Sequence, residues 1–409
     1  MSKKLKILIS CYACSPYRGS EPGMGWSFVN GLSKFYEVHV ITEQKKWEKP
    51  IKKYLEEYKN ENLHFYYIRK KRMKLLRKIW PPSYYWFYKS WQKKAFQLAS
   101  DLELKENFDI IHQLNMVGYR EPGYLWKINK PFVWGPIGGT ENVSWKLFPF
   151  FNLYGKVFYG FRNILNSLER SLASRPKMAA QRKNATIIAA TSEIKNTIST
   201  LWKVNSQIIP EVGTLLIGKI NPNQRKENEP LKIVWSGQHT SGKALPILLN
   251  SVSLLNVNIN YKIDVLGVGK ETKNWKNIAT KLNVNQNCNW HGWLERTEAI
   301  NVMKNAHVLC ITSLKDLTST VTLEGLSLGL PIICLNHCGF SFVVNESCGI
   351  KIDISNPEQI YNDFKNSIKY LFENEPERFN LANGAIKRAK DFSWDSKINQ
   401  LNNIYKKLI

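Results

Sequence analysis

The stretch Asp316–Pro331 reads DLTSTVTLEGLSLGLP and places two carboxylates, Asp316 and Glu324, in apolar company. It follows the apolar run HVLCITS, which is typical of a buried strand. Thr318 or Ser319 is a suitable N-cap for a helix that continues through Leu328. Apolar residues recur on every side of this helix, which predicts that it is buried. The segment therefore indicates a strand, a loop and a buried helix in succession.

The two carboxylates have two interpretations. A buried Glu324 needs hydrogen-bond partners, and ligand hydroxyls could supply them. Gly325 has no side chain and would permit the close approach of a ligand or another segment. The free N–H groups at the helix N-terminus suit a diphosphate, and Asp316 lies just before them. Alternatively, Asp316 is a loop or cap residue and Glu324 pairs with a nearby lysine.

The same alternation of apolar strands and amphipathic helices extends over the whole chain. We expect strands at Lys4–Ala13, Tyr36–Thr42, Phe108–Asn115, Pro131–Gly139, Ala185–Ser192, Leu231–Gly237, Tyr261–Gly269, Asn287–Leu294, His307–Ser313 and Pro331–Asn336. Strands that alternate with helices form parallel, doubly wound sheets through right-handed crossovers. Ligands of such sheets bind beyond the carboxyl ends of the strands, so the strand-to-helix loops are where chemistry is expected.

A polar, charged segment divides the chain. With 409 residues, the chain is long enough for two α/β domains. The segment NPNQRKENEP is bounded by proline and has the composition of a linker. We therefore predict an α/β protein with two Rossmann-like domains: residues 1–215, a linker at 216–230, and residues 231–392.

Two further loops carry candidate binding residues. GSEPGMGW, at 19–26, follows the first strand, and its glycines permit tight turns and close approach to a phosphate or sugar. It matches neither a dinucleotide fingerprint nor a P-loop. WSGQHTSGKALPILL, at 235–249, places Lys243 at the start of a helix, where a cation is unfavourable unless an anion faces it. Lys243 is therefore a candidate diphosphate ligand, or else a solvated surface lysine.

His112 and the cysteines are weaker candidates. His112 lies late in a predicted strand and is either a satisfied core residue or a site residue near the strand end. The Cys11-x-x-Cys14 spacing could be redox-active or metal-binding, but buried thiols are the simpler interpretation. Seven cysteines in a long chain fit a reducing compartment. We therefore expect a cytoplasmic protein.

The charge balance points to an anionic partner. The net charge is +25, and the stretches Arg69–Lys94 and Trp145–Asn163 interleave bases with aromatic rings. This mixture suits an anionic membrane surface, where rings lie at headgroup level. Stacking on single-stranded nucleic acid, or rings in the core beneath a solvated face, are the alternatives. We expect the membrane surface and no nucleic acid.

The motifs in this order resemble retaining glycosyltransferases of the GT-B fold, family 4, over nearly the whole chain. DLTSTVTLEGLSLGLPIICLN is similar to that family's acidic motif, and SGQHTSGKALPILLNSV to its donor-phosphate loop. HGWLERTEAINVMKNAHVLCITS resembles the segment before the acidic motif. CSPYRGSEPGMGW and FVWGPIGG look like a bacterial branch. FSWDSKINQLNNIYKKL resembles the C-terminal helix that returns to the N-terminal domain, here at about 393–409.

The resemblance implies a role for each matching residue. Lys243, Asp316 and His112 would be catalytic: the lysine neutralises the leaving diphosphate, and Asp316 contacts the sugar near its anomeric centre. Glu324 would bind the ribose hydroxyls. The other implied donor contacts are Gly237, Gln238, Thr320, Val321, Trp293 and Leu294. The loop implied to face the diphosphate or acceptor contributes Gly19, Glu21, Gly23 and Gly25.

The sequence departs from the family pattern at three places. Asp316 stands where the family has glutamate, so its carboxylate reaches about one methylene less. Gln238 stands where the family usually has arginine, which removes one positive charge from the leaving group's surroundings. Leu114 occupies one common histidine position, whereas His112 matches the other.

These features predict a transferase that works without a cofactor or metal. A front-face mechanism uses positioned positive charge on the departing diphosphate and needs no protein nucleophile. The D-x-D motif of the metal-dependent transferase fold is absent from the sequence. We expect transfer from a nucleotide-sugar to a lipid-linked or polysaccharide acceptor in envelope glycan synthesis, at the inner face of the membrane. The alternatives are another GT-B enzyme, such as a sugar-nucleotide epimerase or phosphorylase, and a non-catalytic protein that binds anionic glycan or nucleic acid.

Overall fold

The computed structural model describes residues 4–71, 75, 79, 83–215 and 220–409. Parts of two predicted segments, the basic stretch Arg69–Lys94 and the linker 216–230, lie outside these residues. The chain forms two compact units. Unit 1 comprises 1–141, 168–213 and 394–409, and unit 2 comprises 142–167 and 214–393. We describe each unit separately.

Unit 1 is built on a seven-stranded parallel sheet. Its strands are β1 (Lys6–Cys11), β2 (Glu37–Glu43), β3 (Leu63–Ile68), β4 (Ile110–Asn115), β5 (Phe132–Ile137), β6 (Ala185–Ala189) and β7 (Ser206–Ile208). The strand order is β3-β2-β1-β4-β5-β6-β7, so the winding reverses between β1 and β4. The helices are α1 (Ser20–Leu32), α2 (Gln44–Glu57), α4 (Ser83–Glu106), α6 (Ser174–Ala180), α7 (Ser192–Trp202) and α15 (Trp394–Lys406).

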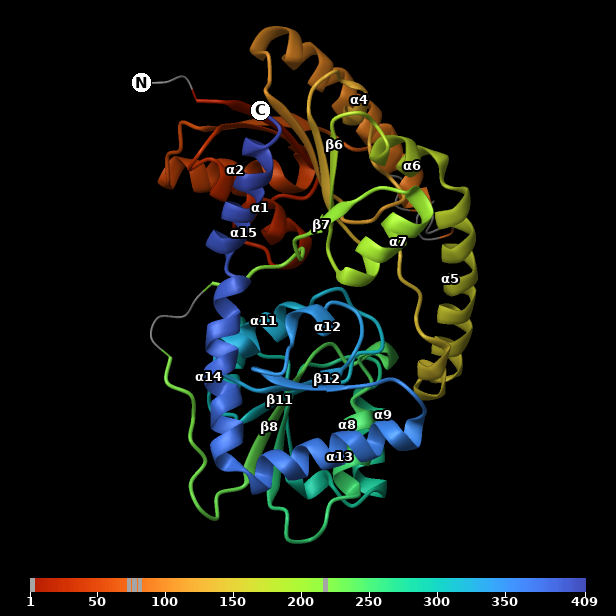
Figure 1. The fold of residues 1–409 in the computed structure, drawn as a ribbon, viewed down its shortest axis with the longest axis vertical. Helices are drawn as coiled ribbons and strands as arrows, with labels where there is room; N and C mark the ends of the chain where they lie inside the picture. Colours follow the sequence, from red (N-terminus) through yellow and green to blue (C-terminus); the bar gives the residue numbers. More distant parts are fainter. Residues whose placement is uncertain (1–3, 72–74, 76–78, 80–82, 216–219) are drawn as a thin grey trace. The chain divides into compact units, whose positions relative to one another are not determined.

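Unit 2 repeats this plan with six parallel strands. They are β8 (Leu231–Ser236), β9 (Tyr261–Leu266), β10 (Cys288–Gly292), β11 (Val308–Ile311), β12 (Ile332–Leu335) and β13 (Gly349–Ile352), in the order β10-β9-β8-β11-β12-β13. Helices lie on both sides of the sheet (Figure 1). They are α8 (Pro246–Ser253), α9 (Thr272–Lys281), α10 (Arg296–Lys304), α11 (Thr320–Ser327), α12 (Phe340–Val343), α13 (Pro357–Glu373) and α14 (Glu375–Asp391). The predicted pair of Rossmann-like, doubly wound domains is confirmed.

The boundary between the units differs from the predicted one at residues 142–167. This segment was expected in the first domain, but it packs on unit 2, where Leu147 and Phe151 join the core. It contains most of helix α5 (Leu153–Leu172), which ends in unit 1. The physical reason is the burial of apolar side chains of this segment in the core of unit 2. Gly155 adds a close approach, since a Cβ there would stand 3.0 Å from the hydroxyl oxygen of Ser241.

The C-terminal helix α15 belongs to unit 1 and lies beside α1 (Figure 1). The side chain of Ile398 packs directly on Gly31 of α1. A Cβ added to Gly31 would lie 2.5 Å from the nearest side-chain atom of Ile398. Two buried hydrogen bonds fix the helix: Tyr36 Oη donates to Asn402 Oδ1 at 2.5 Å, and Tyr405 Oη lies 2.6 Å from His112 Nδ1. The chain's last helix is therefore an integral part of the first sheet's packing.

The described cysteines are buried and carry free thiols. Cys11 and Cys14 pack in the core of unit 1, and burial raises the pKa of the Cys11 thiol. The buried-thiol interpretation of the Cys-x-x-Cys spacing is therefore confirmed. None of the helices that the structure describes has the length and apolarity that a membrane span requires.

We expect Tyr405→Phe to lower the free energy of unfolding by about 1–3 kcal/mol, because it leaves the buried His112 Nδ1 without its partner. Urea unfolding followed by tryptophan fluorescence measures this. The exposed Tyr370 provides the control, since Tyr370→Phe removes a hydroxyl from the surface and should change stability by less than about 0.5 kcal/mol. Equal effects of the two substitutions would show that the Tyr405 hydrogen bond does not anchor α15.

Candidate active site

The candidate site in unit 2 forms at the carboxyl edge of its sheet. The strand order reverses between β8 and β11, and ligands of doubly wound sheets bind outside the strand ends at such a switch point. The loop after β8 contains Lys243, in a single 3₁₀ turn over Ser241–Lys243. The loop after β11 contains Asp316 and leads into α11. The topology alone therefore brings Lys243 and Asp316 together.

Lys243 and Asp316 form an ion pair in which Lys243 Nζ donates to Asp316 Oδ2. About a quarter of each side chain is exposed, so both are accessible to a ligand. A hydrogen bond holds the backbone of Lys243 in place: Thr312 Oγ1 donates to the Lys243 carbonyl oxygen at 2.8 Å. The Gly242 carbonyl accepts from the Leu314 N–H, also at 2.8 Å. The two loops are thus held together by hydrogen bonds beneath the charged pair.

Helix α11 begins at Thr320 with Ser319 as its N-cap residue. The Ser319 side chain makes no capping hydrogen bond, and its backbone has a positive φ of 65°, in the left-handed region. The first N–H groups of a helix have no partner within the helix, so those near Thr320 and Val321 are available to an anion. The predicted burial of this helix is confirmed, because Thr322, Leu323 and Leu326 are buried.

Glu324 is held by an arginine on a neighbouring helix. Its Oε1 accepts a hydrogen bond at 2.9 Å from Nε of Arg296, at the start of α10, and forms an ion pair at 2.9 Å with a terminal nitrogen of the same guanidinium. The glutamate side chain is 13% exposed and the arginine side chain is 67% exposed. The partner is therefore an arginine, where the sequence suggested a lysine or a ligand. Because Arg296 is mostly solvated, it can move aside at little cost.

The remaining predicted donor residues of unit 2 lie in the loops after β8 and β10. Gly237 and Gln238 follow β8, and the Gly237 N–H donates to the Leu266 carbonyl at 3.1 Å. Gln238 is exposed, whereas His239 beside it is buried between aromatic rings, and burial lowers the pKa of His239 to about 4. Trp293 is 66% exposed and Leu294 is half-buried, just after β10. An exposed tryptophan at this edge can stack on a planar base.

Two residues of this site were missed by the sequence analysis. Arg296 was not singled out, although a basic residue at a helix start is unfavourable and indicates an anion nearby. Tyr159 of α5 lies against the 3₁₀ turn Ser241–Lys243. A Cβ added to Gly242 of this turn would stand 3.0 Å from the hydroxyl oxygen of Tyr159. Burial and the charge of Asp316 raise the pKa of Tyr159. Only the packing of 142–167 on unit 2 reveals this residue.

The predicted residues of unit 1 have different surroundings. His112 is fully buried, with Nδ1 against Tyr405 Oη and Nε2 2.8 Å from the Gly135 carbonyl oxygen. Burial lowers its pKa to about 4. Both ring nitrogens of His112 thus have a partner within unit 1, as the core interpretation expects. The catalytic role that the resemblance implies for His112 stays a prediction.

The glycine-rich loop of unit 1 combines packing with an open face. A Cβ on Gly23 or Gly25 would lie 2.2 or 2.3 Å from a backbone oxygen, so these glycines permit close packing. Glu21 Oε1 accepts from the Val117 N–H at 2.8 Å, and burial raises the pKa of Glu21. Gly19, by contrast, has no atom within 4 Å of the Cβ position and lines a pocket of about 750 Å³. The pocket also takes in Arg18, Lys46, Trp47 and Tyr17.

A family model and curated proteins match part of the chain. Residues 217–388 match the family model described as Glycosyl transferases group 1, so this segment carries a group 1 glycosyl transferase domain. The chain is 25% identical over 176 residues to an uncharacterized glycosyltransferase of Methanocaldococcus jannaschii, covering 43% of this chain and 48% of that protein. It is 22% identical over 139 residues to D-inositol 3-phosphate glycosyltransferase of Corynebacterium aurimucosum, covering 34% of this chain and 32% of that protein. The matches thus span about half and a third of these relatives.

Solved structures resemble nearly the whole chain. The lipopolysaccharide outer core galactosyltransferase WaaB is 16% identical with a TM-score of 0.66, covering 99% of this chain and 100% of that one. Sucrose-phosphate synthase of Thermosynechococcus elongatus is 13% identical with a TM-score of 0.65 and covers 99% of both chains. Anabaena HepE in complex with UDP is 13% identical with a TM-score of 0.62, covering 99% and 100%. These likenesses show the GT-B fold.

We expect Gly267→Ala to destabilise the site's loops by about 2–3 kcal/mol. Gly267 has a φ of +113°, and a Cβ there would stand 2.0 Å from the Gly237 carbonyl oxygen, a backbone atom that cannot rotate away. Gly292→Ala is the matched control: its φ is +73°, but the nearest atom is 4.0 Å away, so strain alone costs about 1 kcal/mol. Urea unfolding midpoints compare the two. A Gly267→Ala variant as stable as the control would mean that the two loops are not held in contact.

Proposed function

We propose that the protein is a retaining, metal-independent glycosyltransferase of family 4 that moves a sugar from a nucleotide-sugar to a lipid-linked or polysaccharide acceptor. The observation that carries the proposal is the Lys243–Asp316 ion pair at the switch point of unit 2, beside the N-terminus of α11. A lysine, a helix N-terminus and a carboxylate together suit a departing diphosphate and the sugar attached to it.

The donor diphosphate would take over the ammonium of Lys243. Its negative charge competes with the Asp316 carboxylate for the lysine, and the N–H groups at the start of α11 add further donors. Asp316, released from the lysine, would accept a hydrogen bond from a sugar hydroxyl. Positive charge that is fixed before the reaction stabilises the charge that develops on the leaving group. This requires neither a metal ion nor a protein nucleophile.

Glu324 would bind the ribose hydroxyls once Arg296 moves away. The carboxylate has only 13% of its side chain exposed and needs a replacement donor, which two adjacent hydroxyls supply. The freed Arg296 guanidinium would remain near the donor and add positive charge, which offsets the glutamine at position 238. Trp293 offers an exposed ring for the base. Anabaena HepE, which shares this fold, has been solved with UDP and with UDP-glucose.

The acceptor would enter through the pocket beside Gly19 in unit 1. Arg18 and Lys46 supply positive charge, while Trp47 and Tyr17 supply flat apolar faces. This combination fits a sugar or sugar phosphate whose ring stacks on an aromatic side chain. One of the structures of the same fold, WaaB, is named as a lipopolysaccharide outer core galactosyltransferase, and lipopolysaccharide is an envelope glycan. This supports the proposal of an envelope glycan as the acceptor.

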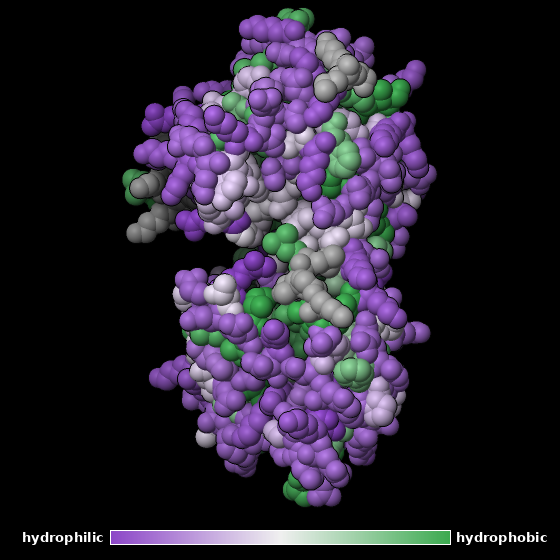
Figure 2. Space-filling view, turned by 90° about the vertical axis from the view of Figure 1, so that its left-hand side faces the viewer, coloured by the Kyte–Doolittle hydropathy of each residue, from purple (hydrophilic) through white to green (hydrophobic). Residues whose placement is uncertain are grey.

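Membrane association rests on helix α5, whose apolar face points outward. Large apolar residues recur along it and are 40–79% exposed: Leu153, Tyr154, Val157, Phe158, Phe161, Ile164, Leu165, Leu168 and Leu172. The buried residues of α5 are Gly155, Asn163 and Asn166, and Asn163 is bonded to the backbone of Val143 at 2.8 and 2.9 Å. The residues visible in Figure 2, by contrast, are mostly hydrophilic. An exposed apolar helix face of this size, with Lys156 and Arg162 beside it, suits an anionic bilayer surface.

The basic and aromatic stretch Arg69–Lys94 contributes less to the proposed membrane-binding surface than α5 does. Tyr88 and Trp91 of α4 are buried and pack on Tyr12, so these rings are core residues. Trp86, 61% exposed, is free to reach a membrane. We place the protein at the inner face of the cytoplasmic membrane on the basis of α5 and the net charge of +25.

A donor screen tests the enzymatic proposal. We expect one of the UDP-, GDP- or ADP-sugars to bind with micromolar affinity in the presence of a metal chelator, measured by calorimetry. Lys243→Ala and Glu324→Ala should each weaken binding about 10- to 100-fold, since each removes a hydrogen bond to or from a charged group. Lys281→Ala, at an exposed lysine of α9, should leave the affinity unchanged. A folded protein that binds no nucleotide-sugar would refute the transferase proposal.

Vesicle sedimentation tests the membrane proposal. The wild-type protein should sediment with vesicles that contain phosphatidylglycerol. Phe161→Glu combined with Ile164→Glu should abolish most of this binding, because each change places a charge on the exposed apolar face of α5. Val257, which is fully exposed in unit 2, provides a matched control in Val257→Glu. If the double variant still sediments like the control, α5 is not the membrane-binding surface.

A further inference from the structure

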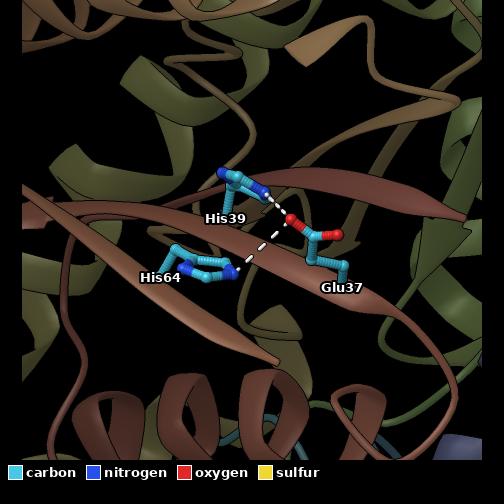
Figure 3. A group of neighbouring side chains, drawn as sticks. All are labelled: Glu37, His39 and His64. Atoms are coloured by element: carbon cyan, nitrogen blue, oxygen red, sulfur yellow. Dashed lines mark hydrogen bonds and ion pairs between the residues drawn. The ribbon is translucent and has the colours of Figure 1, made fainter. Parts of the chain in front are cut away.

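Three potential metal ligands meet in unit 1, apart from the proposed donor site. Among the residues that the structure describes, Glu37, His39 and His64 offer one ligand atom each, and these atoms lie within 4.8 Å of one another. Both imidazoles turn Nε2 toward the same oxygen of Glu37 (Figure 3). The Nε2–Oε1 distances are 3.0 Å for His39 and 3.5 Å for His64.

The register of two parallel strands causes this convergence. His39 of β2 and His64 of β3 are direct partners, so their side chains leave the sheet on the same face. Glu37 precedes His39 by two residues and therefore projects from that face as well. The strands are the last two at one edge of the sheet, in the order β3-β2-β1. The three side chains are thus positioned by backbone pairing, which fixes them more firmly than a loop would.

The distances match the spacing of ligands around a tetrahedral ion. With metal–nitrogen and metal–oxygen bonds of about 2.0–2.1 Å, two ligands of a tetrahedral Zn²⁺ lie about 3.3 Å apart. The two measured separations, 3.0 and 3.5 Å, fall on either side of this value. Two imidazoles and one carboxylate also form a recognised Zn²⁺ ligand set with one position left for water. The third separation, between the two imidazole nitrogens, is at most 4.8 Å, so a side-chain adjustment of about 1 Å brings all three ligands to this spacing.

The surroundings of the cluster also fit a metal. The second ring nitrogen of His39, Nδ1, lies 3.0 Å from Tyr66 Oη, and this hydrogen bond orients the imidazole ring. Metal-bound histidines usually have such an outer-shell partner on the nitrogen that does not bind the metal. The edge of Phe108 packs against the same ring, with centroids 5.0 Å apart. The His39 side chain is 3% exposed, but that of His64 is 41% exposed. The cluster thus has a rigid buried side and an open side through which an ion can enter.

One neighbouring cation has to be considered. Lys6 Nζ lies 3.7 Å from Glu37 Oε1, but it also pairs with Glu106. Lys6 can therefore keep Glu106 as its partner when an ion takes Glu37. The negative charge of Glu106 then offsets the positive charge of Lys6, which weakens the electrostatic repulsion between Lys6 and the metal ion.

We propose that Glu37, His39 and His64 bind a divalent transition-metal ion of the Zn²⁺ type, which cross-links the edge strand β3 to β2. Imidazole nitrogens with a carboxylate favour Zn²⁺ and its neighbours over Mg²⁺ or Ca²⁺, which prefer oxygen ligands alone. Glu37 is the first residue of β2, so the cluster lies toward the amino ends of the strands. Sugar transfer is expected beyond their carboxyl ends. The metal therefore stabilises unit 1 and takes no part in the proposed reaction.

Calorimetric titration of the untagged full-length protein with Zn²⁺, after dialysis against a chelator, tests this proposal. We expect one equivalent to bind with micromolar or higher affinity and to raise the melting temperature. Mg²⁺ should not bind. Co²⁺ at the same site should give the visible absorption bands of a tetrahedral ion.

Variants locate the ion. His64→Ala, His64→Gln and Glu37→Gln should each weaken Zn²⁺ binding about 100-fold and abolish the rise in melting temperature. The control is His291→Ala, because His291 forms a comparable ion pair with Asp264 at 2.7 Å in unit 2 without belonging to a three-ligand group. The control should bind Zn²⁺ like the wild type. The proposal is overturned if the wild type does not bind Zn²⁺ at 100-fold excess, or if the folded His64 variants, verified by circular dichroism, bind it undiminished.

Discussion

The parallel direction of the strands is the constraint on which the proposed site depends. All six strands of unit 2 run the same way, so every strand-to-helix loop emerges at one edge of the sheet. Lys243 and Asp316 are far apart in sequence, yet they become neighbours because β8 and β11 are adjacent. The glycines after β8 and β9 then permit the loops to touch, with the Gly237 and His239 N–H groups bonded to Leu266 and Val268. The chemistry is a consequence of this topology.

The central strands could be predicted from the sequence, whereas three of the four edge strands could not; the edge strand β10 was expected at Asn287–Leu294. Each of the ten expected strands is found, within a few residues at its ends. The strands that were missed, β3, β7 and β13, all lie at the edge of a sheet. An edge strand is buried on fewer sides, so it needs no continuous apolar run, and β7 and β13 are only three and four residues long. The Glu37, His39 and His64 cluster depends on β3 and was therefore not predictable.

The site was predictable to the extent that it follows from local motifs. Lys243, Asp316 and Glu324 each belong to a recognisable loop or helix, and the structure places the first two in contact. Arg296, a basic residue at the start of a helix, carried a local signal that was not used. Tyr159 comes from a segment whose position is determined by tertiary packing, and no local pattern indicates it. For His112, the sequence left two interpretations open. The structure shows a buried His112 whose Nδ1 faces the hydroxyl of Tyr405. This tyrosine comes from the last helix, far away in sequence, so no local pattern could predict the contact.

The proposed transfer requires a donor diphosphate to replace the Asp316 carboxylate as the partner of Lys243. A crystal structure of the protein with a bound nucleoside diphosphate would test it most directly. We predict that Lys243 Nζ lies within hydrogen-bond distance of a phosphate oxygen near the first turn of α11, and that Glu324 has exchanged Arg296 for the ribose hydroxyls. A nucleotide bound elsewhere, with the Lys243–Asp316 and Arg296–Glu324 pairs both intact, would contradict the account.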